Sequence, residues 1–220
     1  MSQFRVNHQA TTGQGYKSET AQEHDPAGGG GPNIFWAFAP WIIFDVVAGP
    51  STWKLAAFSA LVASVVLAVP DLLKRHGLPK LLDLTGFVFF AVISILGMVL
   101  DRSQLLWLET YSQTIASGAL ALVALGSLAH VPFTEQYARD SAPREAWDTP
   151  LFKRINRVLT AVWGLVFAVT AILGLIALHV KSGSDWLNWV IPISLLVLAM
   201  RFTRWYPPYA REQDSQARAI

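Results

Sequence analysis

The chain has 220 residues, of which 53% are apolar and only 15% are charged, and its formal net charge is +2. Because that charge is the small remainder of 17 basic and 15 acidic residues, it does not favour nucleic acid as a partner. Cysteine is absent, which excludes disulfides, thiolate nucleophiles and iron–sulfur ligation together.

Residues 1–33 are polar, poor in aliphatic side chains, and end in a run of four glycines followed by Pro32. Such a composition cannot bury enough apolar surface to offset the entropy of the chain. The segment is therefore predicted to be a disordered cytoplasmic tail. It has no apolar stretch after a basic start, so we do not interpret it as a signal peptide.

The rest of the chain is dominated by apolar blocks without any charged residue. A bilayer core about 30 Å thick is crossed by roughly 17 to 25 mostly apolar helical residues. Core helices of a soluble protein would instead show one polar face. Membrane-spanning helices are therefore predicted around five blocks, at residues 55–69, 84–100, 110–129, 158–180 and 186–200.

A sixth span is predicted at residues 34–49, although Pro40 and Asp45 interrupt it. The distribution of basic residues favours this sixth span, because Lys and Arg are concentrated in every second segment, or break, between the apolar blocks. Three breaks hold a single basic residue each: Lys54, Arg102 and Lys181. Cytoplasmic loops retain Lys and Arg, so these three breaks are predicted to be outside and both termini inside.

The predicted fold class is an all-α, polytopic membrane helical bundle with six transmembrane helices. Its membrane domain covers residues 34–205, and residues 206–220 form a second cytoplasmic tail. The predicted spans are 34–49, 53–70, 82–100, 106–129, 157–180 and 186–203.

Two acids lie within predicted spans, Asp45 and Glu109, each about one helical turn from the outer end. Charged groups in a span are costly and are candidates for function. One interpretation is a proton- or cation-binding pair at the mouth of a pathway. The other is an interfacial ion-pair network with Arg102 and Lys54, which we favour because neither acid is near the bilayer centre.

Basic residues at the inner side are candidates for lipid headgroup binding. They are Lys74 and Arg75 in the first inner loop and Lys153, Arg154 and Arg157 before the fifth span. The preferred alternative is an ordinary positive anchor for the next helix. The long inner break is expected to lie along the membrane interface with its rings inserted, namely Phe133, Tyr137, Trp147 and Phe152.

Tryptophans and small residues support the span assignments. Trp53, Trp107, Trp186 and Trp189 fall at predicted outer ends and Trp36 and Trp205 at inner ends, whereas Trp41 and Trp163 are expected between helices. Small residues that repeat on one helix face permit close helix packing. Three such stripes occur: Ala57, Ala60, Ser64 and Ala68; Ser117, Ala121 and Ala124; and Ala161, Gly164, Ala168 and Ala171.

No enzyme signature occurs, and no catalytic residue is predicted. No cofactor or metal is predicted either, because His130 and His179 lie at opposite membrane faces and His76 with His130 is a weak haem signal. An inner pocket at Asp71, Asp83 and Arg157 would favour a third function, intramembrane lipid modification.

Several short motifs resemble the intracellular septation protein A family and its relatives, over Phe35 to Pro207. These motifs are Phe38-Ala39-Pro40, Lys74-Arg75-His76, Trp107, the stretch Phe133 to Arg139, and the run from Phe152 to Trp163. The resemblance implies a polytopic bacterial inner-membrane protein with a role in envelope maintenance or septation. It supplies no catalytic residues.

The sequence thus predicts a non-enzymatic scaffold that acts through lipid contacts and through contacts with its own copies or with envelope proteins. The alternatives are a small proton- or cation-coupled transporter or channel that uses Asp45 and Glu109, and the lipid-modifying enzyme.

Overall fold

The computed structural model describes residues 32–49, 52–73, 79–180 and 184–218, and the regular elements within these ranges are helices. Residues 1–31 of the predicted tail lie outside the described residues, as do Lys74, Arg75 and Lys181. The elements in chain order are α1 (Pro32–Ala37), α2 (Ala39–Val47), α3 (Trp53–Leu73), α4 (Leu81–Val99), α5 (Arg102–Ser127), α6 (Phe133–Ala138), η1 (Arg144–Ala146), α7 (Pro150–Ala177), η2 (Trp186–Val190) and α8 (Ile191–Arg218).

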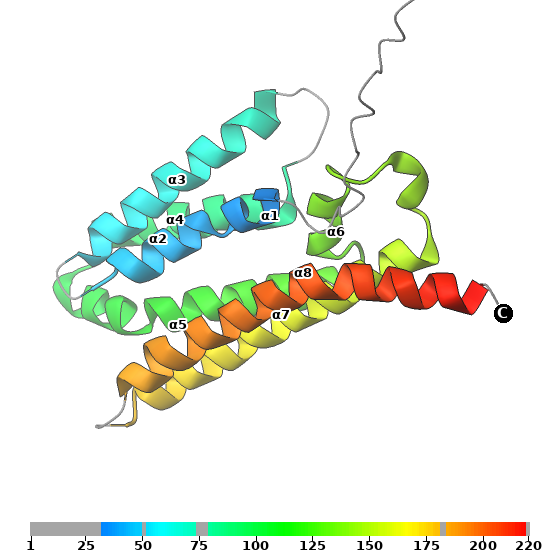
Figure 1. The fold of residues 1–220 in the computed structure, drawn as a ribbon. Helices are drawn as coiled ribbons and strands as arrows, with labels where there is room; N and C mark the ends of the chain where they lie inside the picture. The colour runs from blue at the N-terminus through cyan, green and yellow to red at the C-terminus, as the bar shows by residue number, and fades with distance from the viewer. Residues whose placement is uncertain (1–31, 50–51, 74–78, 181–183, 219–220) are drawn as a thin grey trace, which may run out of the picture.

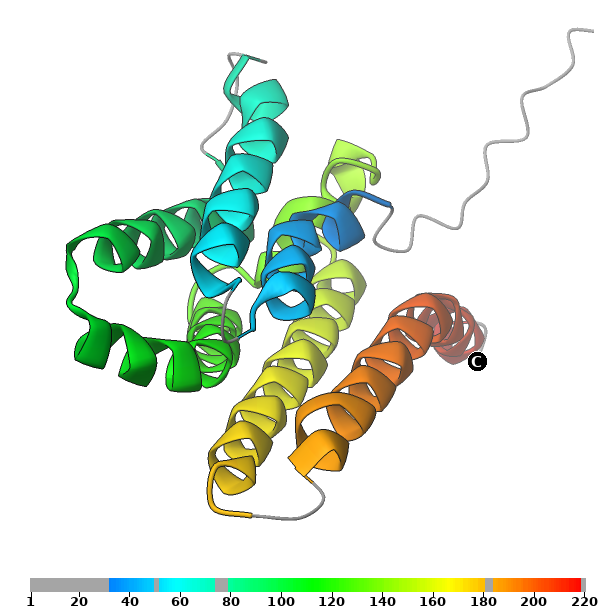
Figure 2. The same ribbon diagram turned by 90° about the vertical axis from the view of Figure 1, so that its left-hand side faces the viewer.

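The helices form two groups, which Figure 1 shows one above the other. Helices α2, α3 and α4 pack together in the first group, and α5, α7 and α8 in the second. Helix α4 contacts α5 less extensively than it contacts α3 (Figure 2). The short helix α6 contacts α1, α4 and α7, so it joins the groups at the end opposite the α4–α5 loop.

The predicted first span is divided between α1 and α2 at Phe38. Pro40 is the second residue of α2, a position where its missing N–H costs no helix hydrogen bond. The Phe38 ring stacks on Trp163 of α7 with ring centres 4.8 Å apart, and it lies 5.5 Å from Phe167. The interruption of the helix at Phe38 therefore places an aromatic side chain of the first group in contact with the second group.

Small residues allow the close helix contacts that the sequence predicts. Ala57, Ala60 and Ser64 are buried within the first group. In the second group, a Cβ atom added at Gly164 would lie 2.5 Å from Cδ2 of Leu125. Helices α5 and α7 therefore meet at a distance that only glycine permits at that position.

The tryptophans divide between the interior and the surface. Trp41 and Trp163 are buried, which confirms their predicted place between helices. Trp53 begins α3, at the end of the helix as predicted, but it is buried with 4% exposure because its ring covers Gly97 of α4. The other tryptophans predicted at the span ends are exposed: Trp36, Trp107, Trp186, Trp189 and Trp205. Trp147, which was expected with its ring inserted at the inner interface, is half-buried.

Three helical stretches are long and apolar enough to cross a membrane, among the residues described. They are Leu81–Val99, Pro150–Ala177 and Trp186–Arg218, while Trp53–Val69 is a shorter apolar helix. Only 28%, 33% and 17% of their most apolar windows are buried, so their aliphatic side chains face outward. Such large exposed apolar surfaces are typical of contact with lipid.

The first part of the long inner break, helix α6, does not lie on the surface as expected, whereas residues 139–150 after it are exposed or half-buried. Five of the six residues of α6 are buried, including Phe133 with 1% and Tyr137 with 2% exposure. The insertion of these two rings into the membrane interface was therefore a wrong prediction, since they pack inside the bundle.

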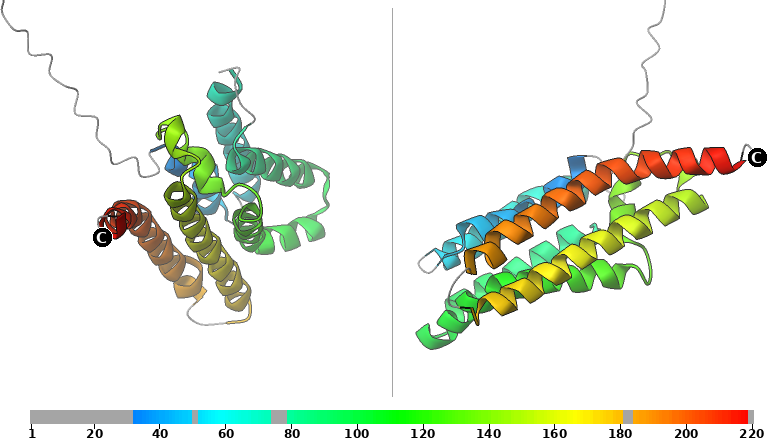
Figure 3. Two further views of the ribbon diagram at one scale, coloured as in Figure 1. Left: turned by 90° about the vertical axis from the view of Figure 1, so that its right-hand side faces the viewer. Right: turned by 60° about the horizontal axis from the view of Figure 1, so that its bottom comes forward.

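Helix α8 continues to Arg218 through Pro207 and Pro208, and its end projects past the neighbouring helices (Figure 3).

Candidate functional site

Helices α2 and α5 place the two predicted acids at the same end of the bundle. The Nε2 atom of Gln113 donates a hydrogen bond to the backbone oxygen of Asp45 at 3.1 Å. Glu109 lies one turn before Gln113 on α5, so it is on the helix that contacts Asp45. Both acids are half-buried.

The basic residues predicted to pair with these acids do not do so. Lys54 on α3 and Arg102 on α5 are both exposed. In the described part of the chain, ion pairs within 4.0 Å include neither acid and neither of these bases. The structure therefore brings Asp45 close to α5 through a backbone contact, without the predicted ion-pair network.

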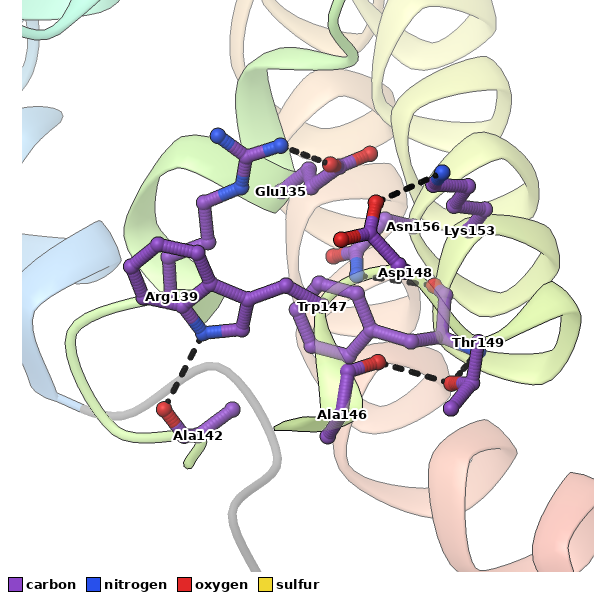
Figure 4. A network of polar contacts seen from close by, with 10 residues as sticks. Glu135, Arg139, Ala142, Ala146, Trp147, Asp148, Thr149, Lys153 and Asn156 are labelled. Carbon is purple, nitrogen blue, oxygen red and sulfur yellow. Dashed lines mark hydrogen bonds and ion pairs between the residues drawn. The ribbon is translucent and has the colours of Figure 1, made fainter. Parts of the chain in front are cut away.

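The basic residues at the start of α7 are exposed, as headgroup ligands would be. Lys153 forms an ion pair with Asp148 at 3.0 Å (Figure 4). Arg154 and Arg157 are exposed on the following turn. Headgroup binding at this helix remains a prediction.

A buried polar network fixes α6 against α7. The hydroxyl of Thr134 donates to the backbone oxygen of Asn156 at 2.8 Å and lies 2.8 Å from the hydroxyl of Thr160. At the start of α6, the N–H of Phe133 donates to Oγ of Ser127 at 3.0 Å. Side chains of α5 and α7 therefore satisfy groups at the open N-terminus of a helix too short to do so itself.

A buried acid lies beside this network. The Glu135 carboxylate, with 5% side-chain exposure, accepts a hydrogen bond from Nη2 of Arg139 at 2.6 Å. The guanidinium carbon of Arg139 lies 5.2 Å from the ring centre of Trp147, whose indole N–H donates to the backbone oxygen of Ala142 (Figure 4). These contacts hold the loop around η1 onto α6.

The sequence interpretation missed Glu135 and Arg139 as a pair. One signal was present, because an acid and a base four residues apart face each other on a helix. The signal was weak because the segment is mixed in charge and contains three prolines, which indicated an interfacial loop. Burial of α6 depends on α1, α4 and α7, and the local pattern of α6 does not reveal these contacts.

Eight buried polar residues occur in the described part of the chain, and each forms a hydrogen bond or an ion pair within the protein. They are Ser64, Ser112, Ser127, Thr134, Glu135, Asn156, Thr160 and Thr203. Four other buried atoms, in Trp41, Trp53, Ser94 and Arg139, have no hydrogen-bond partner. Within the described ranges, no three His, Asp or Glu side chains come together as a metal ion would require.

Two surface hollows border α4 in the described part of the chain. One lies between the start of α4, the end of α5 and α6, and the other lies farther along α4. Neither is lined by Asp45 or Glu109, nor by Asp83 or Arg157 of the predicted lipid-modifying pocket.

The fold and these contacts define an all-α helical bundle with several membrane-length apolar helices. No family model, curated protein or solved structure matches the chain. The resemblance to the septation family therefore gains no support from these comparisons.

Proposed function

We propose that the protein is a multi-pass scaffold of the bacterial inner membrane, with six spans and both termini in the cytoplasm. The alternation of basic residues supports this topology, and the outward-facing apolar helices support the membrane location. The short pieces α1 and α2 together would form the first span.

One observation carries the scaffold interpretation: buried polar side chains on different helices are joined to one another or to the backbone of the next helix. Thr134, Asn156 and Thr160 are joined across α6 and α7, and Trp163 and Thr203 are joined across α7 and α8. A binding or catalytic site in the interior would need polar groups that are directed at a ligand. These groups instead fix one helix against the next, which suits a protein that presents a stable surface to its partners.

The second candidate function is proton or cation movement at Asp45 and Glu109. It is favoured by the bond from Gln113 to the Asp45 backbone, because that bond brings the two acid-bearing helices together. Acids inside a membrane segment are common in proton relays.

A flux assay separates these two functions. The full chain is reconstituted into vesicles, and proton and potassium flux are measured for the wild type, Asp45→Asn and Glu109→Gln. A scaffold is expected to give the flux of empty vesicles in each case. Wild-type flux above that background, reduced at least tenfold in either variant, would establish the transport function and contradict the scaffold.

A further inference from the structure

The larger hollow is a groove that opens sideways between the two helix groups. It has a volume of about 500 Å³. Its lining residues come from the start of α4, the last turns of α5, the following loop and α6: Leu81, Leu122, Val123, Gly126, Ser127, His130, Val131 and Gln136. The walls are mainly aliphatic, and Leu122 is 77% exposed at the edge.

The smaller hollow extends this groove along α4. Its lining residues are Leu84, Thr85, Val88, Phe89 and Val92. Leu81 of the larger hollow lies one turn from Thr85, so the two hollows share one face of the helix. We call them together the α4 trough. From Leu81 to Val92 it extends about 17 Å, at 1.5 Å per residue.

The hydroxyls of Thr85 and Ser127, which also line the α4 trough, donate to backbone oxygens of their own helices. The other donors among the described lining residues are His130 and Gln136, at the inner end of the trough. His130 is exposed there. Gln136 accepts the Leu81 N–H through Oε1 at 2.8 Å, which leaves its amide N–H groups as donors. Next to Leu81, the ammonium of Lys80 is paired with the Asp140 carboxylate at 2.5 Å, so the polar groups that face the hollow are those of His130 and Gln136.

We propose that the α4 trough binds one acyl chain of a membrane glycerophospholipid, whose phosphate lies at His130 and Gln136. The aliphatic walls match the chain, and the donors at the inner end match the negative phosphate. A second copy of the protein fits less well. An apolar helix of a second copy would match the aliphatic walls, but it would bring no anion to His130 and Gln136. The assignment rests on the membrane location proposed above.

Two glycines of α5 provide a matched test. A Cβ atom added at Gly126 or at Gly118 meets nothing within 4 Å, so a larger residue fits at either position. Only Gly126 lines the α4 trough. Gly126→Leu should therefore fill the groove, whereas Gly118→Leu should change helix α5 equally and leave the groove open.

The probe is a phosphatidylethanolamine with a diazirine at the middle of one acyl chain, in vesicles that contain the full-length protein. After irradiation, labelled peptides are expected from residues 81–92 and 122–131. Gly126→Leu should reduce this labelling about tenfold, and Gly118→Leu should leave it unchanged. Equal labelling of the two variants, or labelling spread over the other helices, would overturn the proposal.

The phosphate position has its own variants. Gln136→Glu keeps an acceptor for the Leu81 N–H and places a negative charge beside the phosphate. His130→Ala removes the exposed ring. Each should reduce labelling by about tenfold, as expected for one lost charge-assisted hydrogen bond. Unchanged labelling in both would overturn the headgroup assignment.

Two measurements on the same samples separate other outcomes. Release of the wild-type protein from membranes by alkaline carbonate would refute the membrane location itself. A cross-linked dimer through α5, with no lipid label in the α4 trough, would identify a second copy as the occupant and refute the lipid proposal.

Discussion

The indole N–H of Trp163 donates to the hydroxyl of Thr203 at 3.0 Å, and this bond ties α7 to α8. Both residues are almost completely buried, with exposures of 1% and 2%. The Thr203 hydroxyl also donates to the backbone oxygen of Ala199, so each group in this short relay is satisfied. Helix α8 has few buried residues, and this bond fixes its rotation against α7.

Removal of this bond should loosen α8. Trp163→Phe and Thr203→Val each delete one partner, and a double-mutant cycle with both isolates the bond itself. Interhelical hydrogen bonds in membranes contribute about 0.6 kcal/mol on average and up to about 1.7. We expect a coupling free energy in this range from unfolding measured in detergent. A coupling of zero would show that the Trp163 ring acts only by packing.

Gly164 should tolerate no larger residue. In Gly164→Ala the new Cβ would lie 2.5 Å from Leu125 Cδ2 and 2.8 Å from Cγ, so either the Leu125 side chain must move or α5 and α7 must separate. Overpacking of this kind costs about 1–3 kcal/mol. Thermal unfolding should show a lower midpoint, and Leu125→Ala in the same chain should restore part of it.

Gly118→Ala is the matched control for Gly164→Ala. Nothing lies within 4 Å of the added atom, so the change should stabilise α5 by up to about 1 kcal/mol through helix propensity. If both alanine variants have the same midpoint, the close contact between α5 and α7 does not exist in solution.

The pair of Glu135 and Arg139 should respond asymmetrically to substitution. Arg139→Met leaves the Glu135 carboxylate buried without its partner, and we expect a loss of about 1–3 kcal/mol. Glu135→Gln should cost less, because the Arg139 side chain is 36% exposed and water can solvate it. The free energy of unfolding checks this order, and a larger loss in Glu135→Gln would contradict it.

Asp101 should make the start of α5 sensitive to acid. Its side chain accepts the N–H of Gln104 and the hydroxyl of Ser103, and these bonds lower the pKa of the carboxyl. The stabilising contribution is therefore present above the usual carboxyl pKa of about 4 and is lost as pH falls through the lower folded value.

The comparison of Asp101→Ala with the wild type tests this dependence. The alanine variant should have the lower unfolding midpoint at neutral pH, and the difference should diminish below about pH 4. Asp101→Asn keeps a capping oxygen without the charge, so its difference from Asp101→Ala should not change over the same range. A difference between the wild type and Asp101→Ala that is constant with pH would refute the role of the charge.

Local patterns in the sequence predicted the apolar helices but not the way they meet. The blocks without charges match α3, α4, α5, α7 and α8, because a helix that faces lipid must be apolar along its length. Small residues in helical spacing indicated the close contacts at Ala60 and Gly164. The burial of Trp53 and Phe133 was not predictable, because it depends on partners distant in the sequence, such as Gly97 and Ser127.

At the candidate site too, the sequence predicted the residues but not the contacts between them. Asp45 and Glu109 were identified from their depth in apolar segments, and the structure places them at one end of the bundle. Ion pairs of these acids with Arg102 and Lys54 were expected, because all four residues lie near the predicted outer side of the membrane. The structure uses the Gln113 amide instead, a contact that charge patterns do not indicate.

Cysteine labelling tests most directly the proposed topology of six spans with both termini in the cytoplasm. The chain contains no cysteine, so a single introduced one reports only its own position. Ser103 at the start of α5 and Ser215 near the end of α8 are both exposed. With a membrane-impermeant maleimide, Ser103→Cys should react in intact cells, and Ser215→Cys should react only after permeabilisation. Reaction of Ser215→Cys in intact cells would contradict the topology.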